Sequence, residues 1–332
     1  MAVNGKKIPH YIQPMLATAV DKAFSSSDWL FELKLDGYRA IAELRKGKLL
    51  LYSRNGLSLI KRYPSVAIAL RKLKTDIILD GEIVLLNEQG KPDFQKLQNY
   101  AQHKDMPLAY YVFDILSYQQ KDLKSMPLIE RKKLLKKVLK KTGPVRFCSH
   151  IEEHGEDFFK AVRAEDMEGI IAKKKESLYS IGSRTREWLK IKNHKSQEAI
   201  IIGYTSPKGS RNHFGSLLLA QYENEKLKYI GHAGTGFTEN SLHELMEKMK
   251  PLISPRSPLD KPIKANDKVT WVRPKLVCEL SYTEVTKEGK LRHPVFKGLR
   301  PDKESKMVKE ETEKALPVTK VVKSLKKKNG KG

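Results

Sequence analysis

Residues 29–39 read WLFELKLDGYR and place Lys34 between an apolar run and a glycine. Short apolar runs alternate with turns from residue 29 to residue 60, which predicts antiparallel strands joined by hairpins. Glu32 precedes Lys34 by two residues, so both side chains point to one face of the predicted strand. A lysine attacks only as a neutral amine, which requires desolvation or neighbouring cations that lower its pKa. The Lys-x-Asp-Gly pattern alone is common, and a surface lysine in a hairpin is the alternative interpretation.

Beyond this stretch, strands and helices mix without a βαβα order. Predicted strands lie at 76–86, 110–116, 168–174 and 188–192, and predicted helices lie at 64–73 and 127–141. The second helix combines an apolar stripe with a very basic outer face. This arrangement predicts an α+β fold rather than a doubly wound parallel sheet.

The pattern changes near residue 195 and becomes mostly strands. These strands are expected at 199–204, 215–222, 228–233, 268–272 and 278–285, with one helix at 239–250. Five strands and one inserted helix predict a small Greek-key barrel of the OB type. We therefore expect one domain over 1–195 and a second over 196–305. Residues 306–332 are rich in lysine and poor in large apolar side chains, so a disordered basic tail is expected.

The charge balance is strongly basic, with 64 Lys and Arg against 39 Asp and Glu, and a net charge of +25. Such a charge attracts phosphate backbones by electrostatics alone, although a solvated basic surface without a partner is the alternative. Cys148 and Cys278 lie far apart and fit neither a disulfide framework nor a zinc site. No targeting signal, transmembrane run or membrane-surface helix is recognised, so a soluble, intracellular protein is expected.

Short motifs with polar or charged residues recur along the chain. They are YSRNG at 52–56, DGE at 80–82, YYVFDI at 110–115, EGIIAK at 168–173, WLKIK at 188–192 and RHPVFKGLRPDK at 292–303. Lys190 and Lys192 alternate on a strand, so both face one side and can supply cations to a nucleophilic lysine. Each motif alone has a simpler explanation, such as a turn carboxylate for Glu82 or a core aromatic for Phe113.

Taken in order, the motifs resemble those of the covalent nucleotidyltransferases, which include DNA ligases, RNA ligases and mRNA capping enzymes. The sequence is most similar to the ligase module of bacterial end-joining DNA ligases, over roughly residues 14–303. The resemblance implies an antiparallel-sheet nucleotidyltransferase domain, of the ATP-grasp-like ligase type, followed by a C-terminal OB-fold barrel. It also implies a minimal core without the DNA-encircling, polymerase or nuclease domains found in some relatives, and a location in the bacterial cytoplasm or nucleoid.

The resemblance gives four residues a role around the nucleoside of ATP. Lys34 is the nucleophile that takes AMP from ATP and becomes a phosphoramidate. Glu32 accepts a hydrogen bond from the adenine amino group, and Arg39 contacts the ribose. Phe113 stacks on the purine.

Other matching residues are implied to surround the phosphates. Arg54 holds the AMP phosphate and later the 5′-phosphate of the nick. Glu82 lies near the ribose and the metal, and Glu168 binds Mg²⁺, with Mn²⁺ as an alternative. Lys190 and Lys192 hold the α-phosphate in the transition state.

In the second domain, Arg300 and Lys303 are implied to orient the pyrophosphate leaving group. Lys208 and Arg211 lie on a Gly-rich turn, where DNA phosphate contacts are expected and a solvated loop is the alternative.

The implied function is ATP-dependent sealing of nicked or broken double-stranded DNA in repair or end joining. It proceeds through a lysyl-AMP and a 5′-adenylated DNA intermediate. A monomer is expected, and a Ku-type end-binding protein is a candidate partner. Two alternatives stay open: an RNA ligase or capping enzyme on the same fold, and a non-catalytic DNA-binding module.

Overall fold

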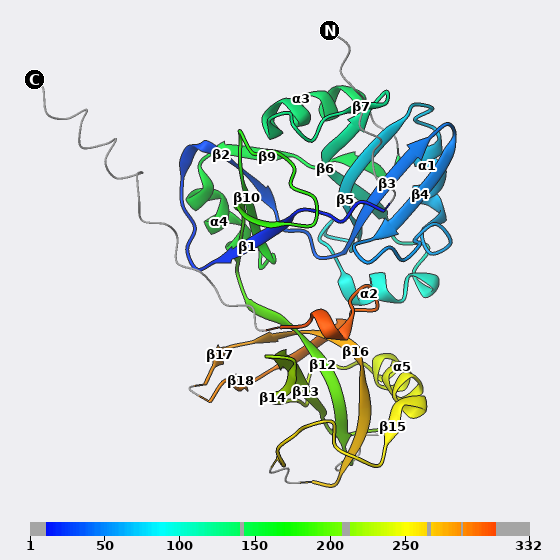
Figure 1. Cartoon of the computed structure of the whole chain (residues 1–332), viewed down its shortest axis with the longest axis vertical. Coiled ribbons are helices and arrows are strands. Elements are labelled where there is room, and N and C mark those ends of the chain that lie inside the picture. Colours follow the sequence, from blue (N-terminus) through cyan, green and yellow to red (C-terminus); the bar gives the residue numbers. More distant parts are fainter. Residues whose placement is uncertain (1–10, 140–142, 208–212, 264–266, 287, 310–332) are drawn as a thin grey trace, which may run out of the picture. The chain divides into compact units, whose positions relative to one another are not determined.

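The computed structural model describes residues 11–139, 143–207, 213–263, 267–286 and 288–309. Within them the chain forms two compact units (Figure 1). Unit 1 contains the described residues up to 92 and those from 107 to 193, and unit 2 contains residues 93–106 and those from 194 onward. The expected basic tail lies almost wholly outside the described residues. None of the described helices has the length and hydropathy needed to span a lipid bilayer.

The first sheet of unit 1, sheet A, has the order β1-β11-β10-β2-β9. Its strands are β1 Leu16–Val20, β11 Arg184–Lys192, β10 Gly169–Lys174, β2 Ser26–Leu33 and β9 His150–Glu153. One face packs on α4, Gly155–Ala164, through an apolar cluster that includes Phe31, Ile170 and Leu189. The opposite face carries the alternate side chains of the same strands.

The second sheet of unit 1, sheet B, has the order β4-β3-β5-β6-β7, and β8 pairs with β6. Its strands are β4 Lys48–Ser53, β3 Tyr38–Arg45, β5 Ile77–Leu85, β6 Leu108–Tyr118, β7 Lys121–Asp122 and β8 Val145–Phe147. Two helices complete this unit, α1 Pro64–Arg71 and α3 Leu128–Val138. The helices expected near residues 64 and 127 are therefore confirmed.

One expectation for unit 1 is wrong. β2 and β3 do not form a hairpin, because β2 pairs with β10 and β9 in sheet A while β3 pairs with β4 and β5 in sheet B. The chain crosses between the sheets at Gly37, where a Cβ would lie 2.2 Å from the carbonyl oxygen of Ile83. The outer face of α3 is basic as expected, since Lys133, Lys136 and Lys137 are exposed, but its buried stripe also contains two cations, Arg131 and Lys132, which are 0% and 1% exposed. Acidic side chains inside unit 1 hold both cations, Asp114 that of Arg131 and Glu32 that of Lys132.

Unit 2 is built on one sheet of order β14-β13-β12-β16-β15, with β19 also paired to β16. Its strands are β12 Lys195–Thr205, β13 Leu217–Glu223, β14 Lys226–Ala233, β15 Ile253–Ser254, β16 Val269–Tyr282 and β19 Val295–Leu299, with the small pair β17 Glu284–Val285 and β18 Leu291–Arg292. The helix α5, Glu239–Met249, begins at a Thr238 capping box and buries Leu242 and Leu245 in the core. Short helical segments are α2 Phe94–Gln98, η1 Tyr100–Gln102, η2 Lys250–Leu252 and η3 Ser305–Met307.

The strands expected at 268–272 and 278–285 are mostly one strand, β16. Its pairing with β12 shifts between Ile201 and Gly203, where Leu276 and Trp271 are the opposite residues. The residues between Trp271 and Leu276 form a bulge. Pro274 lies in this bulge, where the N–H that proline lacks is not needed by the ladder. The sequence break therefore marks an irregularity inside a strand rather than a loop.

Candidate active site

Lys34 follows β2 beside the start of β10. Its backbone N–H donates to the carbonyl of Gly169 at 2.9 Å, which sets Lys34 opposite the first residues of β10. Its Nζ forms an ion pair with Oε1 of Glu168, and the two side chains are 20% and 19% exposed. The lysine at the end of one strand and the carboxylate at the start of another therefore meet at a point that solvent can reach.

The two lysines of β11 lie on the same side of sheet A as Glu32. Lys192 is opposite Gly169, and Lys190 is opposite Ile171, which in turn is opposite Glu32. Leu189 and Ile191 alternate with these lysines and pack in the core against α4. Because side chains alternate along a strand, Lys190 and Lys192 belong to the other face. Sheet A thus carries Glu32, Lys190 and Lys192 on one face.

Arg39 lies in sheet B, where its neighbours across β5 and β6 are Glu82 and Tyr111. Its guanidinium donates two hydrogen bonds of 2.6 Å to the fully buried carboxylate of Asp80. The hydroxyl of Tyr179 donates to the same carboxylate at 2.6 Å. Burial would lower the pKa of Arg39, but Asp80 raises it above the ordinary arginine value. Arg39 is therefore permanently charged and is held by a buried carboxylate. Its ion pair is not the exposed surface salt bridge that is the simpler interpretation of such an arginine.

Phe113 points from β6 into the apolar cluster that also contains Trp188 and Tyr179. Its ring meets Trp188 edge to face, with ring centres 6.2 Å apart. The Arg39 guanidinium lies 4.7 Å from the Phe113 ring centre and the Lys173 ammonium lies 4.0 Å from it. Phe113 is thus both a core residue and an aromatic surface next to the charged groups of the site.

Glu32 is buried on the face of sheet A that carries the lysines. One carboxylate oxygen forms an ion pair with Lys132 of α3, and the other lies 2.6 Å from the Lys173 ammonium. Burial alone would raise the pKa of Glu32, but the two lysines lower it below its ordinary value. Glu32 is therefore held as a carboxylate inside unit 1.

Arg54 lies in the turn that follows β4. The N–H of Gly56 donates to the carbonyl of Ser53 at 2.9 Å, and Gly56 has a φ of 77°, which favours glycine. Arg54 is half-buried. The turn explains the Asn-Gly pair, as the sequence indicates.

Two models of known protein families match this chain. Residues 14–192 match the family model of the ATP dependent DNA ligase domain, and residues 210–303 match that of the ATP dependent DNA ligase C terminal region. The chain belongs to the ATP-dependent DNA ligase family. The expected fold class, a nucleotidyltransferase domain with a C-terminal OB fold, is confirmed.

Similar ligases come from bacterial end-joining systems. The multifunctional non-homologous end joining protein LigD of Pseudomonas aeruginosa is 39% identical over 310 residues, covering 91% of this chain and 37% of that protein. LigD of Mycolicibacterium smegmatis is 37% identical over 300 residues, covering 89% of this chain and 39% of that protein. The chain thus spans less than half the length of these relatives.

Solved structures of the same family are also similar to this chain. A mycobacterial DNA ligase D complexed with ATP and MES superposes with a TM-score of 0.68 at 34% identity, covering 90% of this chain and 98% of that one. The ligase domain of Mycobacterium tuberculosis LigD gives a TM-score of 0.51 at 35% identity with the same coverage.

Arg300 and Lys303, near the end of the described chain, are held by acidic side chains of unit 2. The Arg300 guanidinium donates to Asp302 at 2.9 and 2.8 Å and to Glu279 at 2.6 Å. Lys303 forms an ion pair of 2.7 Å with Glu198. Any phosphate that reaches Arg300 must therefore compete with two carboxylates.

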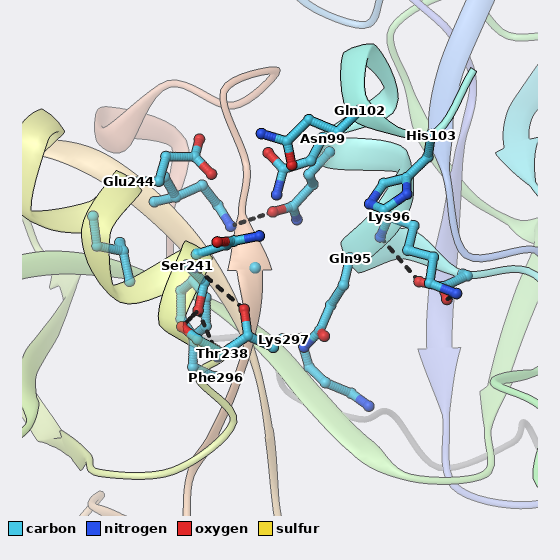
Figure 2. A pocket seen from close by; sticks show the side chains of 16 residues that line it. Gln95, Lys96, Asn99, Gln102, His103, Thr238, Ser241, Glu244, Phe296 and Lys297 are labelled. Atoms are coloured by element: carbon cyan, nitrogen blue, oxygen red, sulfur yellow. Dashed lines mark hydrogen bonds and ion pairs between the residues drawn. The ribbon is translucent and has the colours of Figure 1, made fainter. Parts of the chain in front are cut away.

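Lys208 and Arg211, the predicted DNA contacts, lie outside the described residues. Figure 2 shows a polar pocket lined by residues of α2, α5 and β19, and none of the predicted site residues lines it.

Sequence reasoning missed several polar and charged groups that hold the candidate site residues in place. Asp80, Tyr179, Lys132 and Lys173 were given no role. The sequence of α3 does contain a pattern that could have predicted buried cations. Its buried residues follow the helical spacing of a core stripe, and they are Leu128, Arg131, Lys132 and Leu135. Cations on such a stripe indicate buried acidic partners.

Proposed function

We propose that the chain is a DNA ligase that seals 5′-phosphate/3′-hydroxyl breaks through a lysyl-AMP and a 5′-adenylated DNA intermediate. One observation carries the proposal: Lys34 and Glu168 meet at the edge of the sheet face that bears Lys190 and Lys192. A nucleophilic amine, a carboxylate and phosphate-binding cations are the groups that adenylyl transfer from ATP requires. Their arrangement favours an enzyme over a non-catalytic DNA-binding module.

In this proposal Lys34 attacks the α-phosphorus of ATP, forms the P–N bond and releases pyrophosphate. Lys34 must lose its ammonium proton to solvent, which reaches it, before the attack, because only the neutral amine carries a lone pair. Lys190 and Lys192 stabilise the charge that develops on the phosphate oxygens. AMP then passes to the 5′-phosphate of DNA, and the 3′-hydroxyl displaces it. Arg54 contacts the transferred phosphate.

Nucleoside binding is assigned to residues from both sheets. Phe113 stacks on adenine, and Glu32 accepts from its amino group. Arg39, with its orientation fixed by Asp80, and Glu82, its neighbour across the strands, contact the ribose. We assign orientation of the pyrophosphate to Arg300 and Lys303, and DNA phosphate contacts to Lys208 and Arg211.

The residues fit a divalent metal. Glu168 has a second oxygen, Oε2, that is buried and accepts no hydrogen bond from any described residue. Within the described ranges no three acidic, His or Cys side chains form a metal cluster, which suits Mg²⁺ held by one or two carboxylates and by substrate phosphates. Glu168, and Glu82 from sheet B, would hold it. When bound, Mg²⁺ or Mn²⁺ neutralises the charge on the ATP phosphates.

The biological setting is proposed from the relatives. Their names place them in non-homologous end joining, and the net charge of +25 suits a DNA substrate. We propose that the chain acts as a monomer in DNA repair or end joining, with a Ku-type end-binding protein as a partner. Residues 1–195 would form its adenylation domain, 196–305 its OB-fold domain and 306–332 a basic tail.

The proposed activity is tested by incubating the chain with labelled ATP and then separating the protein on a denaturing gel. With Mg²⁺ we expect a labelled protein band, and excess chelator should lower labelling at least about a hundredfold, because an uncompensated phosphate charge opposes attack. Mn²⁺ should restore it. Labelling with GTP and not with ATP would instead favour a capping enzyme. A chain that stays unlabelled under every metal condition would contradict the proposed activity.

A further inference from the structure

Lys132 reaches from α3 into the interior of unit 1 and is only 1% exposed. Its ammonium pairs with Oε1 of Glu32, and donates to the carbonyl of Cys148 at 3.1 Å and to that of Phe113 at 3.5 Å. An ammonium has three N–H groups, so each has an acceptor here. Lys132 is therefore a fully satisfied buried cation that links α3 to sheet A and to sheet B.

Lys173 contacts the other oxygen of the same carboxylate. It lies on β10 and places its ammonium 2.6 Å from Oε2 of Glu32. The same ammonium lies 4.0 Å from the ring centre of Phe113 and 4.1 Å from that of Trp188. Glu32 is thus clamped between two lysines, and one of them, Lys173, also contacts the Phe113 ring, which is proposed to stack on the base.

This clamp determines which hydrogen bonds Glu32 can make. A buried carboxylate without partners would become protonated, and it would then carry an O–H donor. Paired with Lys132 and Lys173, Glu32 has two oxygens that only accept. A carboxylate offers about four lone-pair positions, so the two lysines leave acceptor capacity for a ligand.

We propose that Lys132 and Lys173 are positioning residues that hold Glu32 as a fixed, acceptor-only group, and that this clamp selects a purine with an amino group at position 6. The 6-amino group of adenine donates to such an acceptor. A 6-oxo group presents lone pairs to a negative charge and is repelled, and a base without a 6-substituent leaves the carboxylate without its hydrogen bond. The inference rests on the proposed adenylation of this chain, whose base contacts it deepens.

The chain offers matched variants for a test. Lys132→Met removes the buried ammonium at similar volume, and Lys133→Met changes the next residue of α3, which is 63% exposed and paired with Glu130. Lys132→Arg keeps the charge. Lys173→Met and Lys174→Met form a second pair, because Lys174 is exposed. Circular dichroism and melting temperature report whether each full-length variant is folded.

The measurement is the rate of self-adenylation, as kcat/KM, with ATP, inosine triphosphate and purine riboside triphosphate. The wild-type chain should prefer ATP to each analogue by about tenfold or more, the worth of a hydrogen bond to a charged group. Lys132→Met should reduce this preference to within about threefold, mostly through the KM for ATP, whereas Lys133→Met should keep it. Lys132→Arg should restore part of it.

Two results would overturn the inference: a wild-type chain that uses purine riboside triphosphate as well as ATP, or a folded Lys132→Met chain with the wild-type preference. If Lys132→Met does not fold, the same preference for ATP over each analogue is compared between Lys173→Met, which should lose it, and Lys174→Met, which should keep it. A wild-type chain that is not adenylated by any nucleotide would instead contradict the proposed function. The two failures are therefore distinguishable.

Discussion

A Lys34→Arg chain is expected to form no covalent AMP, with labelling at least about a thousandfold below wild type. Arginine keeps the positive charge beside Glu168 but stays protonated, so it has no lone pair for attack on phosphorus. The same variant should still seal a nick that already carries a 5′-AMP, because that step needs the 3′-hydroxyl and not the lysine. Both activities are measured on denaturing gels, one with labelled ATP and one with labelled DNA.

The preadenylated nick also serves as the control for folding. A variant that fails in both assays and has a lowered melting temperature is misfolded, and the gentler Lys34→Gln replacement would then be used. Wild-type labelling of a folded Lys34→Arg chain would show that another residue is the nucleophile.

An Arg300→Ala chain is expected to lose about a hundredfold in self-adenylation, the cost of removing one preorganised charge from a transition state. Sealing of a preadenylated nick should stay within about threefold of wild type, because no pyrophosphate leaves in that step. The two rates are measured in single-turnover experiments.

The control for Arg300 must account for its burial. Its removal leaves Asp302 and Glu279 without their shared cation, which can destabilise the fold by about 3 kcal/mol. Arg300→Lys keeps a charge there, and Arg292→Ala removes an exposed arginine of the same motif that pairs with Glu284. Arg292→Ala should behave as wild type. Equal loss in both assays by a folded Arg300→Ala chain would contradict a role restricted to the leaving group.

The sequence predicted the local elements of the fold better than their pairing. The alternation of Lys190 and Lys192 with buried residues was sufficient to place both on one face of a strand. Nothing local, however, indicated that β2 pairs with β10 and β9, which follow it in the chain by more than a hundred residues. Strand partners are set by long-range packing, and the close approach of Gly37 to Ile83 is visible only in the folded chain.

The site shows the same division between local and long-range information. Motif order was sufficient to single out Lys34 and Glu168, and the structure brings them into contact. The buried partners Asp80 and Lys132 were not found, because a charged residue on a strand or an amphipathic helix usually faces solvent. Only the three-dimensional pairing of Lys132 with Glu32 shows that its charge is used inside the protein.

The central claim, that this chain stores AMP on Lys34, is tested most directly by mass spectrometry of the wild-type protein after incubation with ATP and Mg²⁺. The intact mass should increase by one AMP, and fragmentation of the proteolytic peptides should place the adduct on Lys34. Treatment with pyrophosphate should remove it, because the first step is reversible. An AMP adduct on a different residue, or a chain that seals nicks with ATP but never carries AMP, would contradict the account.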